Sequence, residues 1–144
     1  MLTIEDRLAI QQLYARYCAC MDTGDMHGWA HCFTVDGEFD TFTKHKGRDN
    51  IEAYGADVMA RRKTNPWTNG QHWNNNIIVE GDGDSANALC YLVVMGKMKD
   101  SGEHRIVIQG VYQDELAKEG GQWKFRARRV SFDMVKPDAI PKKR

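Results

Sequence analysis

The stretch Asn69-Gly-Gln-His-Trp-Asn-Asn-Asn-Ile-Ile-Val-Glu80 begins polar and ends in a β-branched apolar run, which is typical of a strand entering a core. Successive side chains of a strand point to opposite faces. One predicted face carries His72, Asn74, Asn76 and Ile78, and the other carries Trp73, Asn75, Ile77 and Val79. His72 is therefore expected to point into the core, where it needs a polar partner because an unpaired buried polar group costs about 1–3 kcal/mol.

Three further strands are predicted after this stretch, because short turn signals separate long segments rich in β-branched and aromatic residues. The turns are Gly81–Asp84, Asp100–Gly102 and Glu119–Gly121, and the segments are Ser85–Lys99, His104–Ala117 and Gln122–Val135. Turns of this kind predict antiparallel hairpins. The segments exceed the usual strand length of about five or six residues. We therefore expect a four-stranded antiparallel meander that bends strongly around a core.

A long helix is predicted at the start of the chain. Thr3 followed three residues later by Asp6 is similar to a capping box. The apolar stripe that follows has the spacing of one helical face, and its members are Ile10, Leu13, Tyr14, Tyr17, Cys18 and Met21. Asp22 lies at the edge of this stripe, just before Gly24 breaks the helix. Its carboxylate either ends the helix or faces the interior.

Two shorter helices and one strand are predicted between the long helix and the meander. Asp25 is placed to cap a short helix running through Trp29 and Phe33. Residues 35–43 alternate loosely and indicate an edge strand, and residues 47–62 indicate a third helix whose apolar side includes Tyr54. His27 and His31 are four residues apart, but no acidic or sulfur ligand stands at a fitting spacing beside them. We interpret them as surface histidines and expect no metal.

Composition excludes several classes of protein. Lys and Arg together total 20, as do Asp and Glu, so nothing predicts a nucleic-acid partner. No apolar run could span a membrane and the first residues do not form a secretory signal, so we expect a cytoplasmic location. The four cysteines lack a disulfide or zinc spacing and are expected to be reduced. The length fits one domain over residues 1–136, with a basic tail at residues 137–144.

Together these elements predict an α+β fold, with three N-terminal helices packed on one face of a cone-shaped antiparallel sheet. In the order of elements and in particular segments, the chain resembles the SnoaL-like branch of the nuclear transport factor 2-like (cystatin-like) superfamily. The segments are Ile10–Asp22, Gln71–Asn76, Val79–Asp84 and Gly121–Arg126. Within that branch it is most similar to scytalone dehydratase, the hexachlorocyclohexane dehydrochlorinases and bile acid 7α-dehydratase.

The resemblance implies a catalytic pair formed by Asp22 and His72, which fall where those enzymes carry an Asp at the end of the first helix and a His on the first meander strand. It also implies a substrate pocket that contains Tyr17, Tyr112 and Arg128. Trp73, Asn76 and Tyr54 complete the set of residues expected to contact substrate. Strand alternation leaves open whether Arg126 or Arg128 faces the pocket.

A carboxylate bonded to one imidazole nitrogen would fix the tautomer and leave the other nitrogen as a general base. With no cofactor motif, the expected reaction is a dehydratase-type elimination from a small hydrophobic, aromatic or alicyclic hydroxylated substrate. One alternative is isomerase or polyketide-cyclase-like chemistry through an enolate. Another is a non-catalytic ligand-binding or assembly module like a dioxygenase β-subunit. The resemblance further implies a homotrimer, or else a homodimer.

Overall fold

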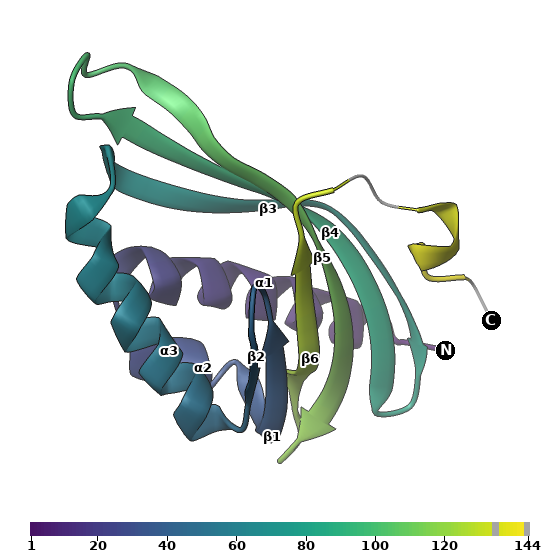
Figure 1. Ribbon diagram of the computed structural model, residues 1–144. Helices are drawn as coiled ribbons and strands as arrows, with labels where there is room; N and C mark the ends of the chain where they lie inside the picture. Colours follow the sequence, from purple (N-terminus) through teal and green to yellow (C-terminus); the bar gives the residue numbers. More distant parts are fainter. Residues whose placement is uncertain (134–135, 143–144) are drawn as a thin grey trace.

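The computed structural model describes residues 1–133 and 136–142, in which a six-stranded sheet curves around a layer of helices (Figure 1). The helices are α1 (Ile4–Thr23), α2 (Met26–Ala30) and α3 (Arg48–Arg61). The strands are β1 (Phe33–Asp40), β2 (Lys44–Lys46), β3 (Trp67–Asp82), β4 (Ser85–Met98), β5 (His104–Glu119) and β6 (Gln122–Ser131). Short 3-10 turns follow at η1 (Arg62–Thr64) and η2 (Pro137–Ala139). The predicted α+β class and curved sheet are confirmed.

Both ends of α1 are fixed by local sequence. The Thr3 hydroxyl accepts a hydrogen bond from the Asp6 backbone N–H, and the Asp6 carboxylate accepts one from the Thr3 N–H, so the predicted capping box is present. Gly24 ends the helix in the left-handed region, with φ of 82°, where a side chain would be strained. Asp22 therefore lies in the last turn of α1, directly before this forced change of direction.

The sheet order β2-β1-β6-β5-β4-β3 confirms the predicted meander and corrects the early strand. β1 was expected at an edge, but it lies between β2 and β6 and pairs with β6 in parallel. The small β2 takes the edge because the chain folds back after Asp40. The short helix also stops earlier than expected, since Phe33 begins β1 rather than ending α2.

Two β-bulges bend β3 on either side of His72. Asn69 and Asn76 adopt φ values of 53° and 56°, and the register with β4 shifts by one residue at each site. The predicted alternation of faces holds at His72 and fails after Asn76, where Val79 is buried while Ile78 is 39% exposed. A bulge inserts an extra residue, so it exchanges the two faces of the strand beyond it. Asparagine tolerates the left-handed region better than other non-glycine residues.

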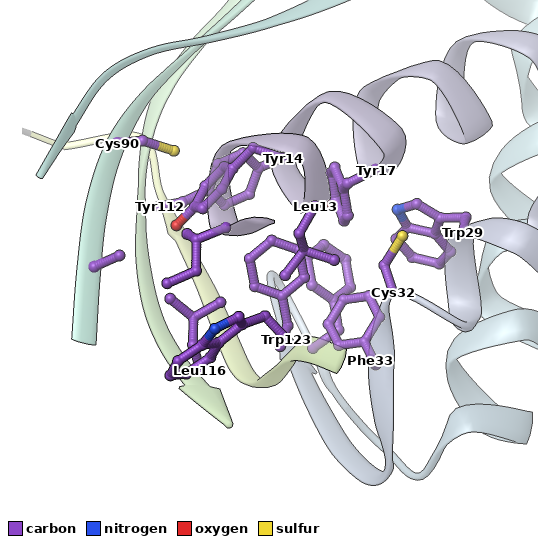
Figure 2. Close-up of a cluster of buried hydrophobic side chains, with 14 of the residues drawn as sticks. Leu13, Tyr14, Tyr17, Trp29, Cys32, Phe33, Cys90, Tyr112, Leu116 and Trp123 are labelled. Carbon is purple, nitrogen blue, oxygen red and sulfur yellow. The ribbon is translucent and has the colours of Figure 1, made fainter. Parts of the chain in front are cut away.

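The core lies between α1 and the concave face of the sheet, and much of it is aromatic (Figure 2). Tyr17 of α1 packs against Trp29 at a ring-centroid distance of 5.7 Å and against Phe125 at 5.6 Å. Tilted and edge-to-face contacts of this kind add about 0.5–1.5 kcal/mol to the burial of area. The aromatic cluster therefore fixes the position of α1 against the concave face of the sheet.

A buried ion pair lies within this aromatic cluster. The Arg128 guanidinium donates to both oxygens of Asp114, at 2.9 and 3.1 Å, and the Tyr14 hydroxyl donates to the same carboxylate. Both charged side chains are fully buried. Burial raises the pKa of Asp114, against the opposing effects of Arg128 and Tyr14. The pair joins β5 to β6 and, through Tyr14, to α1.

The four cysteines are free thiols, as predicted. Burial raises the pKa of Cys18 to about 11 and that of Cys90 to about 12, so these thiols stay protonated near neutral pH. In the described part of the chain, no helix is both long and apolar enough to span a bilayer. β6 ends at Ser131, so Phe132 and Asp133 do not extend the final strand as predicted, and Met134 and Val135 lie outside the described residues.

Removal of one member of the buried ion pair should destabilise the fold strongly. Arg128→Leu leaves the Asp114 carboxylate buried without its counter-ion, and we expect a loss of about 3–5 kcal/mol in the free energy of unfolding. The double variant Arg128→Leu with Asp114→Leu should recover much of that loss, because no charge then remains buried. Urea unfolding of the three proteins measures the difference, and equal stabilities for the single and double variants would contradict the expected coupling.

Candidate active site

Asp22 and His72 meet where the last turn of α1 touches the exposed edge of β3. One Asp22 carboxylate oxygen lies 2.6 Å from His72 Nδ1, and the His72 backbone N–H donates to both oxygens at 3.1 and 3.0 Å. The two side chains are 22% and 17% exposed. The carboxylate thus holds the imidazole and the backbone of the same residue.

This arrangement selects one tautomer of the imidazole. A carboxylate accepts hydrogen bonds, so the ring proton of neutral His72 resides on Nδ1. His72 Nε2 has no hydrogen-bond partner among the described residues and is left as an acceptor. A positioned imidazole of this kind can act as a general base and stabilise the resulting imidazolium through the carboxylate.

Arg62 keeps the end of α1 in place. Its guanidinium donates to the backbone carbonyls of Met21, at 2.5 Å, and Asp22, at 3.2 Å. These carbonyls lack partners within the helix because they belong to its last turn. Desolvation lowers the pKa of Arg62, with the charge of Asp22 acting against the shift. The arginine therefore ties the η1 segment to the turn that carries the carboxylate.

The pair opens onto a cavity of about 800 Å³. Its wall is mainly apolar and aromatic, and comes from α1, α3 and five strands of the sheet. The wall includes Tyr17, Met21, Phe39, Tyr54, Val58, Trp67, Leu92, Val94, Ile108, Tyr112, Val130 and Phe132. A concave, mostly apolar space with a few convergent polar groups is the usual form of a small-molecule site.

Three of the predicted contact residues line this cavity with the pair. They are Tyr17, Tyr54 and Tyr112. Burial raises the pKa of Tyr17 to about 12 and that of Tyr112 well above its usual value, while the charge of Arg128 opposes both shifts. Both phenols therefore stay protonated near neutral pH.

The other three predicted contact residues lie elsewhere. Arg128 is fully buried beneath the cavity wall, with its guanidinium carbon 3.7 Å from the Tyr112 ring centroid and 4.2 Å from that of Tyr17. Its prediction as a pocket residue is corrected: it supports the tyrosines rather than facing the cavity, because Asp114 draws it into the core. Trp73 is 49% exposed on the outer face of the sheet, since it alternates with inward-facing His72. Asn76 is exposed at the second bulge and does not line the cavity.

The histidines on α2 acquire an acidic neighbour that spacing could not reveal. His27 Nδ1 lies 3.2 Å from a carboxylate oxygen of Glu52, which comes from α3. Ligand atoms of His27, His31 and Glu52 lie within 4.8 Å of one another, so these three side chains are the described residues best placed to hold a metal ion. His27 is a surface side chain, 72% exposed as expected, and none of the three lines the 800 Å³ cavity.

Several residues of the cavity entrance were not predicted as site residues. Arg61, Arg62, Lys63 and Lys99 line it, as do the stacked rings of Phe42 and Phe132 at a centroid distance of 5.4 Å. The β4–β5 turn brings Lys99 to the same entrance, and this approach depends on the curvature of the sheet (Figure 1).

The fold and the cavity define a class, that of the cystatin-like, nuclear transport factor 2-like proteins. Within it, residues 2–129 match the family model of the SnoaL-like domain, and the chain belongs to this family. The family includes polyketide cyclases, isomerases and dehydratases, and its members are often enzymes. No curated protein matches the sequence.

Solved structures of the same fold come from several bacteria. An asparagine-for-aspartate variant of Rv3472, a protein of unknown function from Mycobacterium tuberculosis, is 36% identical, with 92% of this chain and 74% of that chain covered and a TM-score of 0.75. An NTF2-like protein with a cystatin-like fold from Novosphingobium aromaticivorans is 25% identical, with coverage of 94% and 87% and a TM-score of 0.76. Aln2 from a Streptomyces species is 24% identical, with coverage of 92% and 94% and a TM-score of 0.80, which shows the fold alone.

The carboxylate of Asp22 should control the tautomer of His72. In the Asp22→Asn variant the amide can donate as well as accept, so the preference for a proton on Nδ1 should weaken. Long-range proton–nitrogen NMR of the neutral ring measures the two tautomers directly. We expect the Nδ1-protonated form to dominate in the parent protein and to lose that dominance in the variant, whereas identical spectra would show that Asp22 does not orient the ring.

Proposed function

We propose that the protein is a cofactor-independent lyase that dehydrates a small hydrophobic, aromatic or alicyclic hydroxylated substrate. The observation that carries the proposal is the 2.6 Å contact between Asp22 and His72 Nδ1 at the wall of an open apolar cavity, with Nε2 unpartnered among the described residues. A module that used this pair only for packing would be expected to have a filled interior.

In the proposed reaction, His72 Nε2 removes a proton from a carbon next to a carbonyl group of the substrate. The electron pair of that C–H bond forms the new double bond as the bond from the neighbouring carbon to its hydroxyl breaks. The imidazolium, stabilised by Asp22, then gives its proton to the departing hydroxide, which leaves as water and regenerates the base.

Tyr17 and Tyr112 are the proposed donors to the substrate carbonyl while negative charge develops on its oxygen. Their raised pKa values keep the hydroxyls protonated at neutral pH, and both side chains line the cavity that holds His72. One well-aimed donor of this type contributes about 2.7–4 kcal/mol to stabilisation of a transition state. Arg128 supports both rings from behind without reaching the substrate.

The same base also supports a second candidate, an isomerase or polyketide-cyclase-like reaction through an enolate. The steps diverge after proton removal: the enolate is reprotonated, or attacks a carbonyl, when no group leaves from the neighbouring carbon. The presence of two protonated tyrosines in the wall favours this alternative as well, because hydrogen-bond donors stabilise an enolate oxygen. Deuterium incorporation into unreacted substrate in heavy water, without loss of water, would identify it.

Substitution of the base should abolish turnover. A panel of hydroxylated aromatic and alicyclic carbonyl compounds, followed by mass spectrometry for loss of water, is the assay. We expect His72→Ala to remove activity and Asp22→Asn to lower kcat by about 100-fold or more with substrate affinity retained. His104→Ala, at an exposed histidine outside the cavity, is the matched control. Full activity in the His72 variant would rule out the proposed base.

We also propose that the outer face of the sheet is covered in a homotrimer. Trp73 and Tyr91 are diagonal neighbours on that face and are 49% and 47% exposed, and Ile106 is 59% exposed nearby on β5. Light scattering after gel filtration should give three times the chain mass of 16.5 kDa. Tyr91→Glu should shift the protein towards smaller species, because it places a charge in an apolar contact. A monomeric parent protein would contradict the assembly.

A further inference from the structure

The cavity that holds His72 has a strong excess of positive charge. Its lining includes one acidic side chain, Asp22, and the carboxylate of that residue is already bound to His72. Four cationic side chains line the same cavity, namely Arg61, Arg62, Lys63 and Lys99. The whole chain has no formal net charge, so this local excess is a property of the site rather than of the composition.

The cations come from two segments that are far apart in sequence and meet at the entrance. Arg61 ends α3 and Lys63 lies in η1, whereas Lys99 belongs to the β4–β5 turn. Lys99 ties the segments together: its Nζ donates to the Lys63 carbonyl at 3.0 Å, and its backbone N–H donates to the Pro66 carbonyl at 2.9 Å. Figure 1 shows this hairpin reaching over the end of α3. The entrance therefore has a basic rim to which both segments contribute.

No described carboxylate forms an ion pair with this rim. None of the four cations forms a salt bridge with a described residue, although exposed cations elsewhere do, such as Lys46 with Glu38 and Arg126 with Glu115. Asp57 and Asp100, the acidic residues nearest in sequence, do not line the cavity. A favourable interaction with the dipole of α3 would explain a cation at Arg61, which ends that helix. It does not explain Lys99, which belongs to the β4–β5 turn.

Arg62 differs from the other three because its guanidinium is committed to α1. It donates to the carbonyls of Met21 and Asp22 and is partly buried. Arg61, Lys63 and Lys99 are exposed, and Arg61 lies over the Tyr54 ring at 6.0 Å from its centroid. Arg61 and Lys99 each donate one hydrogen bond to a backbone carbonyl, that of Asp57 and that of Lys63, and their remaining N–H groups and the Lys63 ammonium can meet a ligand that enters the cavity.

We propose that the rim formed by Arg61, Lys63 and Lys99 is an anion-binding subsite, and that the substrate carries a carboxylate or another oxyanion at the end opposite its reacting carbon. This inference rests on the proposed function in one respect, namely that a guest enters the 800 Å³ cavity. The apolar body of the guest contacts side chains such as Leu92 and Val94 and reaches His72, while its charged end stays at the rim. The basic entrance also attracts anions before contact and so raises the rate of association.

A pair of fluorescent probes tests the subsite without requiring the true substrate. Anilinonaphthalene sulfonate and N-phenylnaphthylamine share one aromatic frame, and the first carries an oxyanion that the second lacks. In the triple variant Arg61→Gln, Lys63→Gln, Lys99→Gln, we expect the Kd of the sulfonate to rise about tenfold and that of the neutral probe to change less than twofold. Added salt should weaken binding of the sulfonate probe to the parent protein and have little effect on its binding to the variant.

A second triple variant controls for net charge. This control removes three positive charges from exposed positions outside the cavity, by the substitutions Arg16→Gln, Arg126→Gln and Lys142→Gln. It should leave the affinities of both probes unchanged. The subsite would be refuted if the two triple variants weakened sulfonate binding equally. It would also be refuted if the rim variant raised the Kd of both probes by the same factor. If neither probe binds, or if the two probes bind without displacing one another, the proposed guest cavity itself is refuted.

The outcome for the subsite is separable from that for the proposed reaction. Probe binding does not depend on proton transfer, so a protein that binds the sulfonate at the rim and dehydrates no compound would refute the lyase and retain the subsite. In the converse case, dehydration of neutral and anionic substrates with equal kcat/KM, unaffected by the rim variant, would refute the subsite and retain the lyase.

Discussion

The contact between the Asp22 carboxylate and His72 is the constraint on which the site depends. β3 is an edge strand of the described sheet, so the backbone N–H of His72 has no neighbour among the described strands on that side, and the carboxylate satisfies it. The same carboxylate binds the ring nitrogen. One acidic side chain therefore closes the sheet edge, joins the helix layer to the strand layer and orients the imidazole at the cavity wall.

Curvature of the sheet gives this contact a space in which to act. The bulges at Asn69 and Asn76 bend β3 on both sides of His72, and the long β4–β5 hairpin continues past the helices until its turn meets η1. A flat sheet would pack along its whole length against α1. The bend instead leaves a cavity between the far part of the sheet and the ends of α1 and α3.

Local sequence predicted much of the fold, whereas the pairing of Asp22 with His72 was implied by the resemblance to the SnoaL-like branch. The capping box, Gly24 and the three hairpin turns are short-range signals that act within a few residues, and each is present as expected. The faces of β3 could not be predicted beyond Asn76, because a bulge depends on how the partner strand pairs. The parallel pairing of β1 with β6 likewise joins segments about ninety residues apart and has no local signal.

The position of Arg128 shows why the sequence did not predict every residue of the cavity wall correctly. Alternation alone places Arg126 and Arg128 on the same face, and it could not reveal the register shift between Glu115 and Leu116 that leaves Arg126 exposed and Arg128 buried. It also could not distinguish a cavity wall from the core beneath it. The distinguishing signal was Asp114, which pairs directly with Arg128 across the β5–β6 hairpin. Counting back from the Gly120–Gly121 turn would place these opposite charges nearly face to face. The basic rim gave no comparable signal, because Lys99 reaches Lys63 only through the three-dimensional bend.

The double use of Asp22 has an evolutionary consequence. A descendant chain that no longer needed the chemistry could exchange the imidazole for almost any side chain, because the backbone N–H at that position would still find its acceptor. Exchange of the carboxylate would instead leave the strand edge and the helix end unlinked. In a lineage that loses the function, the histidine should therefore be substituted first, while the aspartate is retained for its structural contacts.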